Sequence, residues 1–265
     1  RRQRQMCIRD RFDGKNLLEM GEKELDEIRG NRITMIFQDP LTSLNPVFTV
    51  GNQITESIRK HLHLSKEEAA KRAESVLEKV GMPDAHAAMK KYPHTLSGGM
   101  RQRAMIAMAL CCNPALLIAD EPTTALDVTI QAQIMSLLKE LREEIGMSII
   151  LITHDIGLVA SMADRVLVMY AGQIIEEAPA KEIFRAPRHP YTKALLATVP
   201  SIYDGDDREL VSIPGIVPEG YDDIPGCRFA DRCEYRRPEC DKPQENYSFG
   251  EKHRAKCVVM KEEEK

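Results

Sequence analysis

The sequence lacks any apolar run long enough to cross a membrane. A membrane-spanning helix needs about 20 consecutive apolar residues, and the longest apolar stretch, residues 104–119, is interrupted by Asn113-Pro114. The chain shows no signal peptide at its start and has no Met at position 1. We therefore expect a soluble, intracellular protein.

An excess of positive charge is also missing. The 37 Lys and Arg residues are outnumbered by 41 Asp and Glu residues, which gives a net charge of −4 and argues against broad electrostatic attraction to nucleic acid. The Arg-rich segment 1–11 shows no periodicity, and we interpret it as non-native and leave it out of the fold prediction. A basic arm that binds nucleic acid is the alternative interpretation of this segment.

One apolar run ends in two adjacent carboxylates. Residues 116–119 are all apolar and are followed by Asp120-Glu121-Pro122, a pattern that predicts a strand buried in a parallel sheet. Open α/β sheets bind ligands beyond the carboxyl ends of their strands. In phosphoryl-transfer sites one acidic residue holds Mg²⁺ and a second residue orients or deprotonates the attacking water. Solvated acids at a strand end are the structural alternative.

Periodic patterns predict the other elements, in an α/β fold with a mainly parallel sheet. We expect strands at residues 33–37 and 147–153, and a hairpin formed by residues 164–170 and 173–177 around Ala171-Gly172. We expect helices at residues 22–29, 50–61, 97–112 and 127–145, and another that runs from a capping box of Ser65 and Glu68 to Gly81. The region after residue 200 is predicted to be rich in loops.

Polar residues follow two of the predicted strands, and glycines begin one predicted helix. Gln38 follows strand 33–37 and His154 follows strand 147–153; each alone is more often a structural residue. Ser97-Gly98-Gly99 places exposed N–H groups at the positive end of a helix, which favours phosphate binding. An ordinary N-cap serine is the alternative.

These motifs together resemble the ATPases of ABC transporters, over residues 12 to about 260. The motifs that carry the resemblance are Gln38, Leu96-Ser97-Gly98-Gly99-Met100-Arg101-Gln102-Arg103, Asp120-Glu121, Ala125-Leu126-Asp127 and His154. Two further stretches are similar to the D-type subunit of the oligopeptide/dipeptide import family, namely Phe37-Gln38-Asp39-Pro40-Leu41-Thr42-Ser43-Leu44-Asn45-Pro46 and Arg188-His189-Pro190-Tyr191-Thr192. The resemblance implies an ATPase domain at residues 12–199, a helical subdomain at about 48–112 and a tail at 200–265.

The resemblance also implies a role for each strand-end residue. Asp120 is expected to hold Mg²⁺ and Glu121 to be the general base for the attacking water. Gln38 is expected to sense Mg²⁺ and the attacking water and to link to the membrane subunit. His154 is expected to contact the γ-phosphate of ATP.

The signature motif is expected to act on a second subunit. Ser97, Gly98 and Gly99 are expected to contact ATP that is bound to the partner ATPase subunit, and Asp127 to lie at that dimer interface. The implied partners are a second ATPase subunit, two membrane permeases and an upstream peptide-binding protein, without nucleic acid. The implied location is the cytoplasmic face of the membrane, as a peripheral subunit.

One family motif is absent from the sequence. No Gly-x-x-x-x-Gly-Lys-Ser/Thr occurs, and Gly14-Lys15-Asn16 lacks both the first glycine and the hydroxyl group. The backbone N–H groups of this P-loop hold the phosphates and its lysine neutralises them. In the family the P-loop precedes the Phe12 region, so we expect an N-terminally truncated chain that shows no measurable ATPase activity alone.

Four cysteines lie in the tail, at Cys227, Cys233, Cys240 and Cys257, while Cys111 and Cys112 are expected to be buried apolar residues. A reducing cytosol disfavours disulfides, and zinc sites usually have cysteine pairs two to four residues apart, which are missing here. Four thiolates suit an iron–sulfur cluster, and some members of the resembled family carry a [4Fe–4S] cluster in such a tail. Unliganded thiols and zinc are the alternatives.

Two functions of different classes remain. The leading one is an energy-coupling ATPase of an importer for dipeptides and oligopeptides. The rival is a soluble ABC-type ATPase that acts on nucleic acid and carries the cysteines as a zinc module. The negative net charge and the lack of Cys-x-x-Cys pairs argue against the rival.

Overall fold

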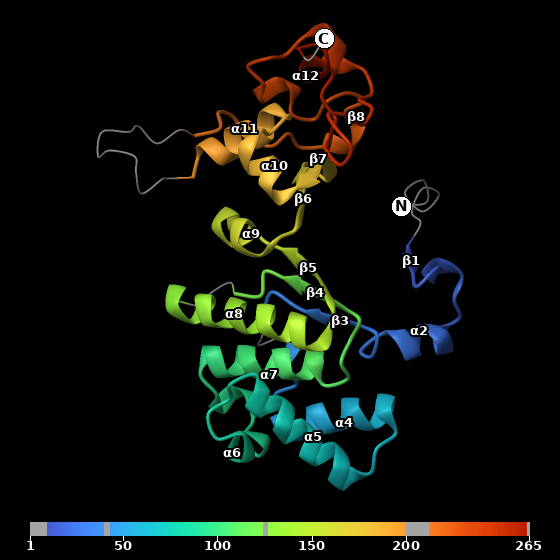
Figure 1. Ribbon diagram of the computed structural model, residues 1–265, viewed down its shortest axis with the longest axis vertical. Coiled ribbons are helices and arrows are strands. Elements are labelled where there is room, and N and C mark those ends of the chain that lie inside the picture. Colours follow the sequence, from blue (N-terminus) through green and yellow to red (C-terminus); the bar gives the residue numbers. More distant parts are fainter. Residues whose placement is uncertain (1–9, 40–42, 124–126, 200–211, 264–265) are drawn as a thin grey trace. The chain divides into compact units, whose positions relative to one another are not determined.

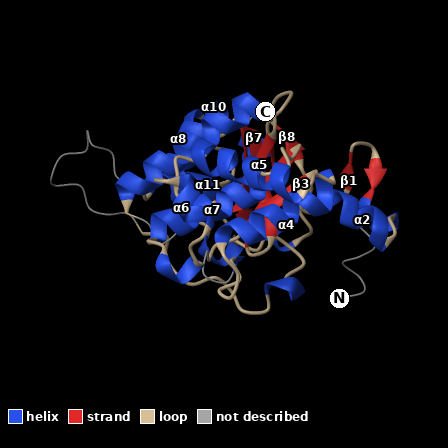
Figure 2. Cartoon of the chain, turned by 90° about the horizontal axis from the view of Figure 1, so that it is seen from below, coloured by secondary structure: helices blue, strands red, loops and turns tan. Residues whose placement is uncertain are grey.

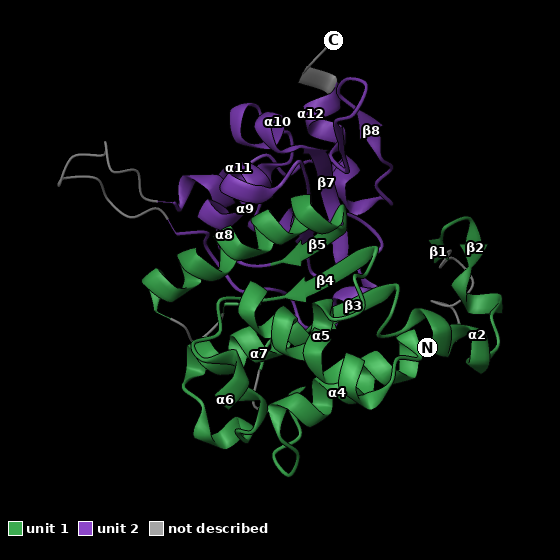
Figure 3. Cartoon of the chain, turned by 60° about the horizontal axis from the view of Figure 1, so that its bottom comes forward, with its two compact units in different colours: residues 1–152 green, residues 153–265 purple. Residues whose placement is uncertain are grey.

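A computed structural model describes residues 10–39, 43–123, 127–199 and 212–263. The chain divides into two compact units, residues 1–152 and residues 153–265 (Figure 3), and each is described by itself. Most of the segment predicted to be non-native, residues 1–9, lies outside the described residues. The predicted boundary between ATPase domain and tail, at residue 200, falls inside the second unit and stays a prediction.

The first unit contains a short hairpin, a parallel sheet and a group of helices (Figure 1). In chain order its elements are β1 (Arg11–Phe12), β2 (Lys15–Asn16), α2 (Glu22–Ile28), β3 (Ile33–Ile36), α4 (Val50–Leu62), α5 (Lys66–Lys79), α6 (Ala85–Met89), α7 (Gly98–Leu110), β4 (Leu116–Asp120), α8 (Val128–Ile145) and β5 (Ser148–Ile152). Asp13 and Gly14, both with positive φ, form the turn between β1 and β2, and this hairpin lies beside α2 (Figure 2).

The sheet of the first unit is parallel, as predicted, with the strand order β3–β4–β5. Ile36 pairs with Ala119, and Asp120 pairs with Ile152, so the carboxyl ends of all three strands share one edge. Leu117 and Ala119 are fully buried on one face, whereas Met35, Ile150 and Ile152 on these strands are 37%, 49% and 47% exposed. One face of the sheet is therefore an uncovered apolar surface.

Helices α4 to α7 lie between β3 and β4 in the chain and form the predicted helical insertion. Helix α4 packs against α5, α6 and α7, and α7 also contacts β3. The capping box of α5 is present, because the Ser65 hydroxyl accepts a hydrogen bond from the Glu68 N–H and the Glu68 carboxylate accepts one from the Ser65 N–H. Gly81, with φ of +68°, follows the end of that helix.

The second unit is built around an antiparallel sheet with the order β6–β7–β9–β8. Its elements are α9 (Ile156–Met162), β6 (Arg165–Tyr170), β7 (Gln173–Pro179), α10 (Ala180–Arg185), α11 (Pro190–Ala197), β8 (Tyr247–Ser248), β9 (Arg254–Ala255) and α12 (Val258–Glu263). Ala171 and Gly172 form the predicted hairpin turn with φ of +45° and +77°. The tail is more ordered than the sequence indicated, because β9 adds to the edge of β7 through the pairing of Ala255 with Glu176.

Two apolar clusters form the core of the second unit. The first contains Val168, Tyr170, Ile175, Ile183 and Phe229, and Phe229 meets Tyr170 edge-on at 5.3 Å between ring centroids. The second cluster lies in the tail and includes Cys240, Cys257, Val259 and Met260. Within the ranges that the structure describes, no helix is long and apolar enough to cross a membrane.

Candidate functional site

Two of the predicted strand-end residues meet at the carboxyl edge of the β3–β4–β5 sheet. Gln38 lies two residues beyond the end of β3, and Glu121 follows Asp120, the last residue of β4. The Gln38 amide nitrogen donates a hydrogen bond to a carboxylate oxygen of Glu121 at 2.8 Å. The parallel register therefore brings together two groups that are 83 residues apart in the sequence.

The backbone of Glu121 is held in an unusual conformation. Its φ of +44° lies in the left-handed region, which costs a non-glycine residue about 1 kcal/mol or more and occurs preferentially at functional sites. The Glu121 N–H donates to the carbonyl of Ile152 at 2.8 Å, across from the end of β5. The turn after β4 is thus fixed by its neighbouring strand.

The signature motif begins helix α7. Ser97 is the N-cap, and its hydroxyl accepts a hydrogen bond from the Met100 N–H at 3.4 Å. Ser97 and Gly98 are exposed, so the positive end of the helix is open to a ligand. A Cβ atom at Gly99 would lie 3.3 Å from Cγ2 of Ile130 in α8, which explains why a glycine suits this position.

A residue of the signature motif to which the sequence assigned no role of its own connects the signature helix to the turn that carries Glu121. Gln102 is buried in α7, and its side-chain amide donates to the carbonyl of Pro122. Pro122 directly follows Glu121, so α7 and the Glu121 turn are tied together. The signal in the sequence is a glutamine that is followed, within a predicted helix, by residues that are almost all apolar.

Asp127 is the N-cap of α8. Its carboxylate accepts a hydrogen bond from the Ile130 N–H at 2.9 Å, and its side chain is at an exposed position. The preceding residues of that motif, Ala125-Leu126, lie outside the described residues, as do Pro40, Leu41 and Thr42 of the motif that follows Gln38. The structure therefore gives Asp127 a capping role without placing the residues before it.

His154 belongs to the second unit and is described only within it. It is exposed and lies in the turn before α9, between Thr153 and Asp155. The Thr153 hydroxyl accepts a hydrogen bond from the Asp155 N–H at 3.0 Å, and the Asp155 carboxylate caps α9 at the Leu158 N–H. The turn thus has a defined local structure around the imidazole.

The four tail cysteines lie in one part of the second unit but do not form the ligand set that the resemblance implied. Burial raises the pKa of the Cys227 thiol to about 11, and the neighbouring thiols of Cys240, Cys257 and Cys233 add to this rise. The Cys227 N–H donates to the Cys240 carbonyl at 2.8 Å. Among the described residues, however, no group of three or more His, Cys, Asp or Glu side chains could hold a metal ion. The thiols as placed therefore do not fit a cluster.

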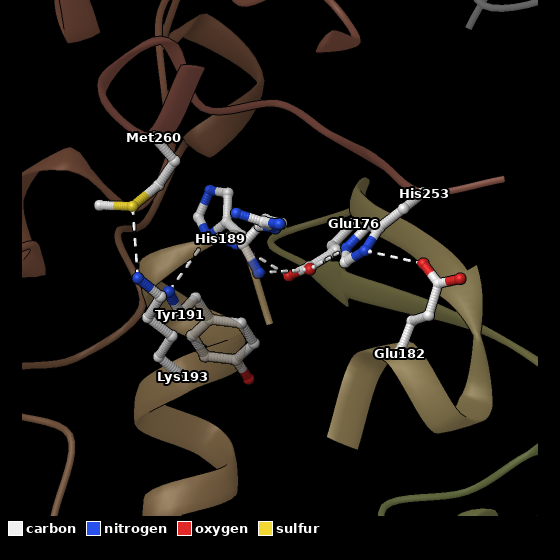
Figure 4. A network of polar contacts seen from close by, with 8 residues as sticks. Glu176, Glu182, His189, Tyr191, Lys193, His253 and Met260 are labelled. Atoms are coloured by element: carbon white, nitrogen blue, oxygen red, sulfur yellow. Dashed lines mark hydrogen bonds and ion pairs between the residues drawn. The ribbon is translucent and has the colours of Figure 1, made fainter. Parts of the chain in front are cut away.

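A buried polar network gives the tail a source of order other than metal ligation (Figure 4). The fully buried carboxylate of Glu176, in β7, accepts hydrogen bonds from the N–H groups of Arg188 at 2.6 Å and His189 at 2.9 Å. His253 of the tail contacts the same carboxylate through Nε2 at 2.7 Å, and its Nδ1 lies 3.3 Å from Glu182. Both nitrogens of one imidazole therefore face carboxylates.

His189 has a structural role in the stretch Arg188-His189-Pro190-Tyr191-Thr192, which carried part of the resemblance. Its side chain is buried, and burial lowers its pKa to about 3. Its Nδ1 accepts a hydrogen bond from the Tyr191 N–H at 3.1 Å, which fixes the start of α11. The ring is thus a neutral structural residue rather than an exposed acid or base.

Comparisons with known proteins agree with these features. Residues 9–124 match the family described as ABC transporter, and residues 175–240 match the oligopeptide/dipeptide transporter C-terminal region. A Brucella abortus protein named as a peptide import ATP-binding protein is 51% identical over 93% of this chain and 74% of its own length. The oligopeptide transport ATP-binding protein OppD of Bacillus subtilis is 56% identical over 84% of this chain and 63% of its own length.

Solved structures of ATP-binding cassettes share the fold. The dimeric cassette MJ0796, in a post-hydrolysis state bound to ADP and Pi, matches with a TM-score of 0.57 and 33% identity, over 64% of this chain and 72% of that one. The protein cbiO1 from Clostridium perfringens, part of the ABC transporter complex cbiONQ, matches with a TM-score of 0.57 and 34% identity, over 66% and 67%. The chain therefore belongs to the ATP-binding subunits of ABC transporters, within the oligopeptide/dipeptide import family.

Proposed function

We propose that this chain is part of the ATP-hydrolysing, energy-coupling subunit of an ABC importer for dipeptides or oligopeptides, and that the chain by itself does not hydrolyse ATP. The observation that carries the proposal is the contact between Gln38 and Glu121 at the carboxyl edge of the parallel sheet, in a chain of this family. The relatives named for peptide import support the substrate class. The subunit is peripheral at the cytoplasmic face of the membrane, and it works with a second ATPase subunit, two permeases and an upstream peptide-binding protein, but not with nucleic acid.

In this proposal Glu121 is the general base for the attacking water, a role that typically contributes about 10²–10⁴-fold to the rate. The Gln38 amide fixes the direction of the Glu121 carboxylate through its 2.8 Å hydrogen bond. Asp120, one residue earlier at the end of β4, supplies a carboxylate for Mg²⁺. Mg²⁺ held there would supply positive charge that offsets the charge on the phosphates of ATP. His154, at an exposed position in the second unit, contacts the γ-phosphate.

The exposed N-terminus of α7 serves the nucleotide of the partner ATPase subunit. Ser97, Gly98 and Gly99 supply N–H groups and a hydroxyl at the positive end of a 13-residue helix, which attracts the γ-phosphate. Asp127, at the start of α8, lies at the interface between the two ATPase subunits. Dimeric solved relatives support a shared site of this kind.

A surface on the first unit suits contact with the permeases. Val47 and Phe48 follow the Gln38 loop and are 71% and 50% exposed, and Tyr92 is 42% exposed. The Val50 N–H donates to the Lys91 carbonyl at 2.9 Å, which brings the start of α4 beside the Tyr92 segment. Large exposed apolar side chains of this kind mark interaction sites. We call Val47, Phe48 and Tyr92 the apolar tip.

A [4Fe–4S] cluster on Cys227, Cys233, Cys240 and Cys257 is a separate proposal. The proximity of these thiols, three of which act electrostatically on Cys227, supports it. Their present arrangement, which forms no metal-holding group among the described residues, opposes it. Iron and acid-labile sulfide in about fourfold stoichiometry after anaerobic purification would support the cluster. Stoichiometric zinc, or neither metal, would reject it.

The first experiment measures ATP hydrolysis by the purified chain. Because its sequence contains no P-loop, we expect no turnover above that of a matched Glu121→Gln variant. If the unsubstituted chain hydrolyses ATP and the Glu121→Gln variant does not, the expected inactivity is wrong and the role of Glu121 as the base is supported. Turnover that the variant retains would point to a contaminating ATPase.

The second experiment separates the peptide importer from the rival function. The tagged chain is purified from detergent-solubilised membranes of cells that express the complete transporter. Recovery of permease subunits supports the importer. Recovery of nucleic acid without permeases, together with stoichiometric zinc, would support the soluble ATPase that acts on nucleic acid and overturn our proposal.

A further inference from the structure

The apolar tip is held by one side chain that the proposed mechanism does not use. Gln53 lies on the first turns of α4 and is half-buried. Its Oε1 accepts a hydrogen bond from the Asn45 N–H at 2.9 Å, and its Nε2 donates to the carbonyls of Asn45 and Phe48, both at 3.0 Å. A single carboxamide thus satisfies three backbone groups of the segment that presents Val47 and Phe48.

The remaining polar groups of this segment are satisfied locally. The Asn45 side chain accepts a hydrogen bond from the Val47 N–H at 3.1 Å, as in an Asx turn, and the Phe48 N–H donates to the Asn45 carbonyl at 3.4 Å. Pro46 has no N–H to satisfy and restricts its own φ and the conformation of Asn45. The segment that presents Val47 and Phe48 is therefore a closed turn, and Gln53 ties it to α4.

The helix that carries Gln53 is itself firmly seated. Thr49 caps α4 by accepting a hydrogen bond from the Asn52 N–H at 3.2 Å. A Cβ atom at Gly51 would lie 2.6 Å from the Met89 carbonyl oxygen, so α4 and the end of α6 are in direct backbone contact. Ile54 and Ile58 are buried beneath the helix. Gln53 therefore fixes the loop to a helix whose own position is fixed by packing.

This arrangement orders the turn before any partner binds, so that docking removes less conformational freedom from it. Ordering a loop and its side chains on binding costs affinity, so a surface that is fixed beforehand binds more tightly. Val47 and Phe48 lie in this closed turn and are both exposed.

We infer that Gln53 is a positioning residue that presets the apolar tip for an apolar cytoplasmic segment of a permease. The inference rests on the proposed function, since it takes the permease as the occupant. It adds a residue on which the coupling between the membrane subunit and the Gln38–Glu121 contact depends. Gln53 itself touches neither nucleotide nor permease.

The test compares Gln53→Met, which keeps the shape of the side chain but removes its hydrogen bonds, with Gln53→Glu, which keeps only the acceptor. Asn52→Met, at the exposed neighbouring position, is the control. Amide hydrogen exchange at Asn45 is expected to rise about tenfold in Gln53→Met, less in Gln53→Glu, and not in Asn52→Met. Exchange in α5 and α7 reports whether the unit is still folded.

The same variants are then tested for co-purification with the permeases of the complete transporter. Gln53→Met is expected to lose most of the permease recovered with the unsubstituted chain, Gln53→Glu is expected to lose part of it, and Asn52→Met none. Faster exchange at Asn45 with full permease recovery would overturn the inference. If the unsubstituted chain itself recovers no permease, the proposed function fails, whatever the variants show.

Discussion

The carboxylate of Glu176 shows what a single buried residue contributes to this protein. It is completely buried and accepts hydrogen bonds from two backbone N–H groups while it faces the His253 imidazole. Removing one partner of a buried ion pair leaves the other without compensation, which costs about 3–5 kcal/mol. The network therefore adds to the pairing of β7 with β9 in holding the tail against β7.

We predict that Glu176→Gln lowers the free energy of unfolding of the second unit by about 3–5 kcal/mol. The amide nitrogen that replaces one carboxylate oxygen cannot accept the N–H groups that now bind there. Denaturant unfolding followed by a probe in the tail, such as exchange at the Ala255 amide, measures the effect. Glu182→Gln, at a side chain that is 52% exposed, should cost less than about 1 kcal/mol; equal losses in the two variants would contradict the prediction.

His189 makes the second unit sensitive to acid. Burial lowers its pKa to about 3 from 6.5. Between these two pH values the His189 ring is neutral in the folded state and protonated in the unfolded state. The stability contribution is complete above pH 6.5 and is lost as the pH falls from 6.5 toward 3, by about 1.4 kcal/mol per pH unit. Replacing His189 by a residue that does not titrate should make the free energy of unfolding of the second unit depend less on pH.

The corresponding measurement is the urea midpoint of His189→Gln and of the unsubstituted chain between pH 7.5 and pH 4.5, with about 0.5-unit steps chosen to cover the range. We expect the two curves to converge as the pH falls. His86→Gln, at an exposed histidine, is the control and should run parallel to the unsubstituted chain. A His189→Gln curve that also runs parallel would show that this imidazole does not titrate on unfolding.

At the residue scale, sequence reasoning found the groups that stand at ends of strands and helices. Gln38 and Glu121 could be singled out because the parallel register makes strand ends adjacent, and in the structure the two side chains share a hydrogen bond. Gln53 and Gln102 were not predicted, because each acts through a backbone carbonyl whose position depends on packing. Polar residues in otherwise apolar helical segments are the signal that would reveal them.

The seating of α4 shows how one position controls a whole helix. Gly51 faces the Met89 carbonyl, and an added Cβ would come within 2.6 Å of it and within 2.9 Å of the Met89 side chain. Backbone cannot move aside as a flexible side chain can. The helix would have to shift, and the Gln53 contacts would shift with it.

We predict that Gly51→Ala lowers the free energy of unfolding of the first unit by about 1–3 kcal/mol, although alanine is the better helix former. Thermal and urea unfolding, monitored by circular dichroism, provide the measurement. Gly21→Ala is the matched control, because its Cβ would meet only the Glu24 carboxylate at 3.9 Å. Similar destabilisation in both variants would show that the contact with Met89 is not the cause.

Elements with a strong period were predictable, and short ones were not. Helix α5 carries a capping box and an apolar stripe, and β4 is an uninterrupted apolar run, so both are close to their expected bounds. Strands β8 and β9 contain two residues each, which is too short for any alternation to show. Their pairing depends on the edge of β7, a tertiary feature.

At the largest scale that the structure describes, one face of the β3–β4–β5 sheet in the first unit carries exposed apolar side chains. Strands of parallel sheets are normally buried on both faces, yet Met35, Ile150 and Ile152 remain accessible here. The face is apolar and continuous across three strands, because Met35 and Ile150 both pair with Ile118. Such a surface favours self-association.

We predict that the chain binds an apolar reporter dye and self-associates at micromolar concentration, and that Ile150→Lys weakens both effects. A charge on this face disfavours stacking of one copy on another without disturbing the buried face. Dye fluorescence and sedimentation velocity measure the change. Val128→Lys, at an apolar residue that is 83% exposed elsewhere, should alter neither; equal effects of the two variants would indicate a general influence of charge.

The left-handed backbone of Glu121 has a consequence for directed evolution of this protein. Asparagine and glycine tolerate a φ of +44° better than glutamate does, so either substitution relieves strain at that turn. A library screened for heat resistance alone should therefore enrich Asn or Gly at this position. Variants selected in this way would survive heating and would lack the carboxylate that we propose as the general base, so stability would be gained at the expense of activity.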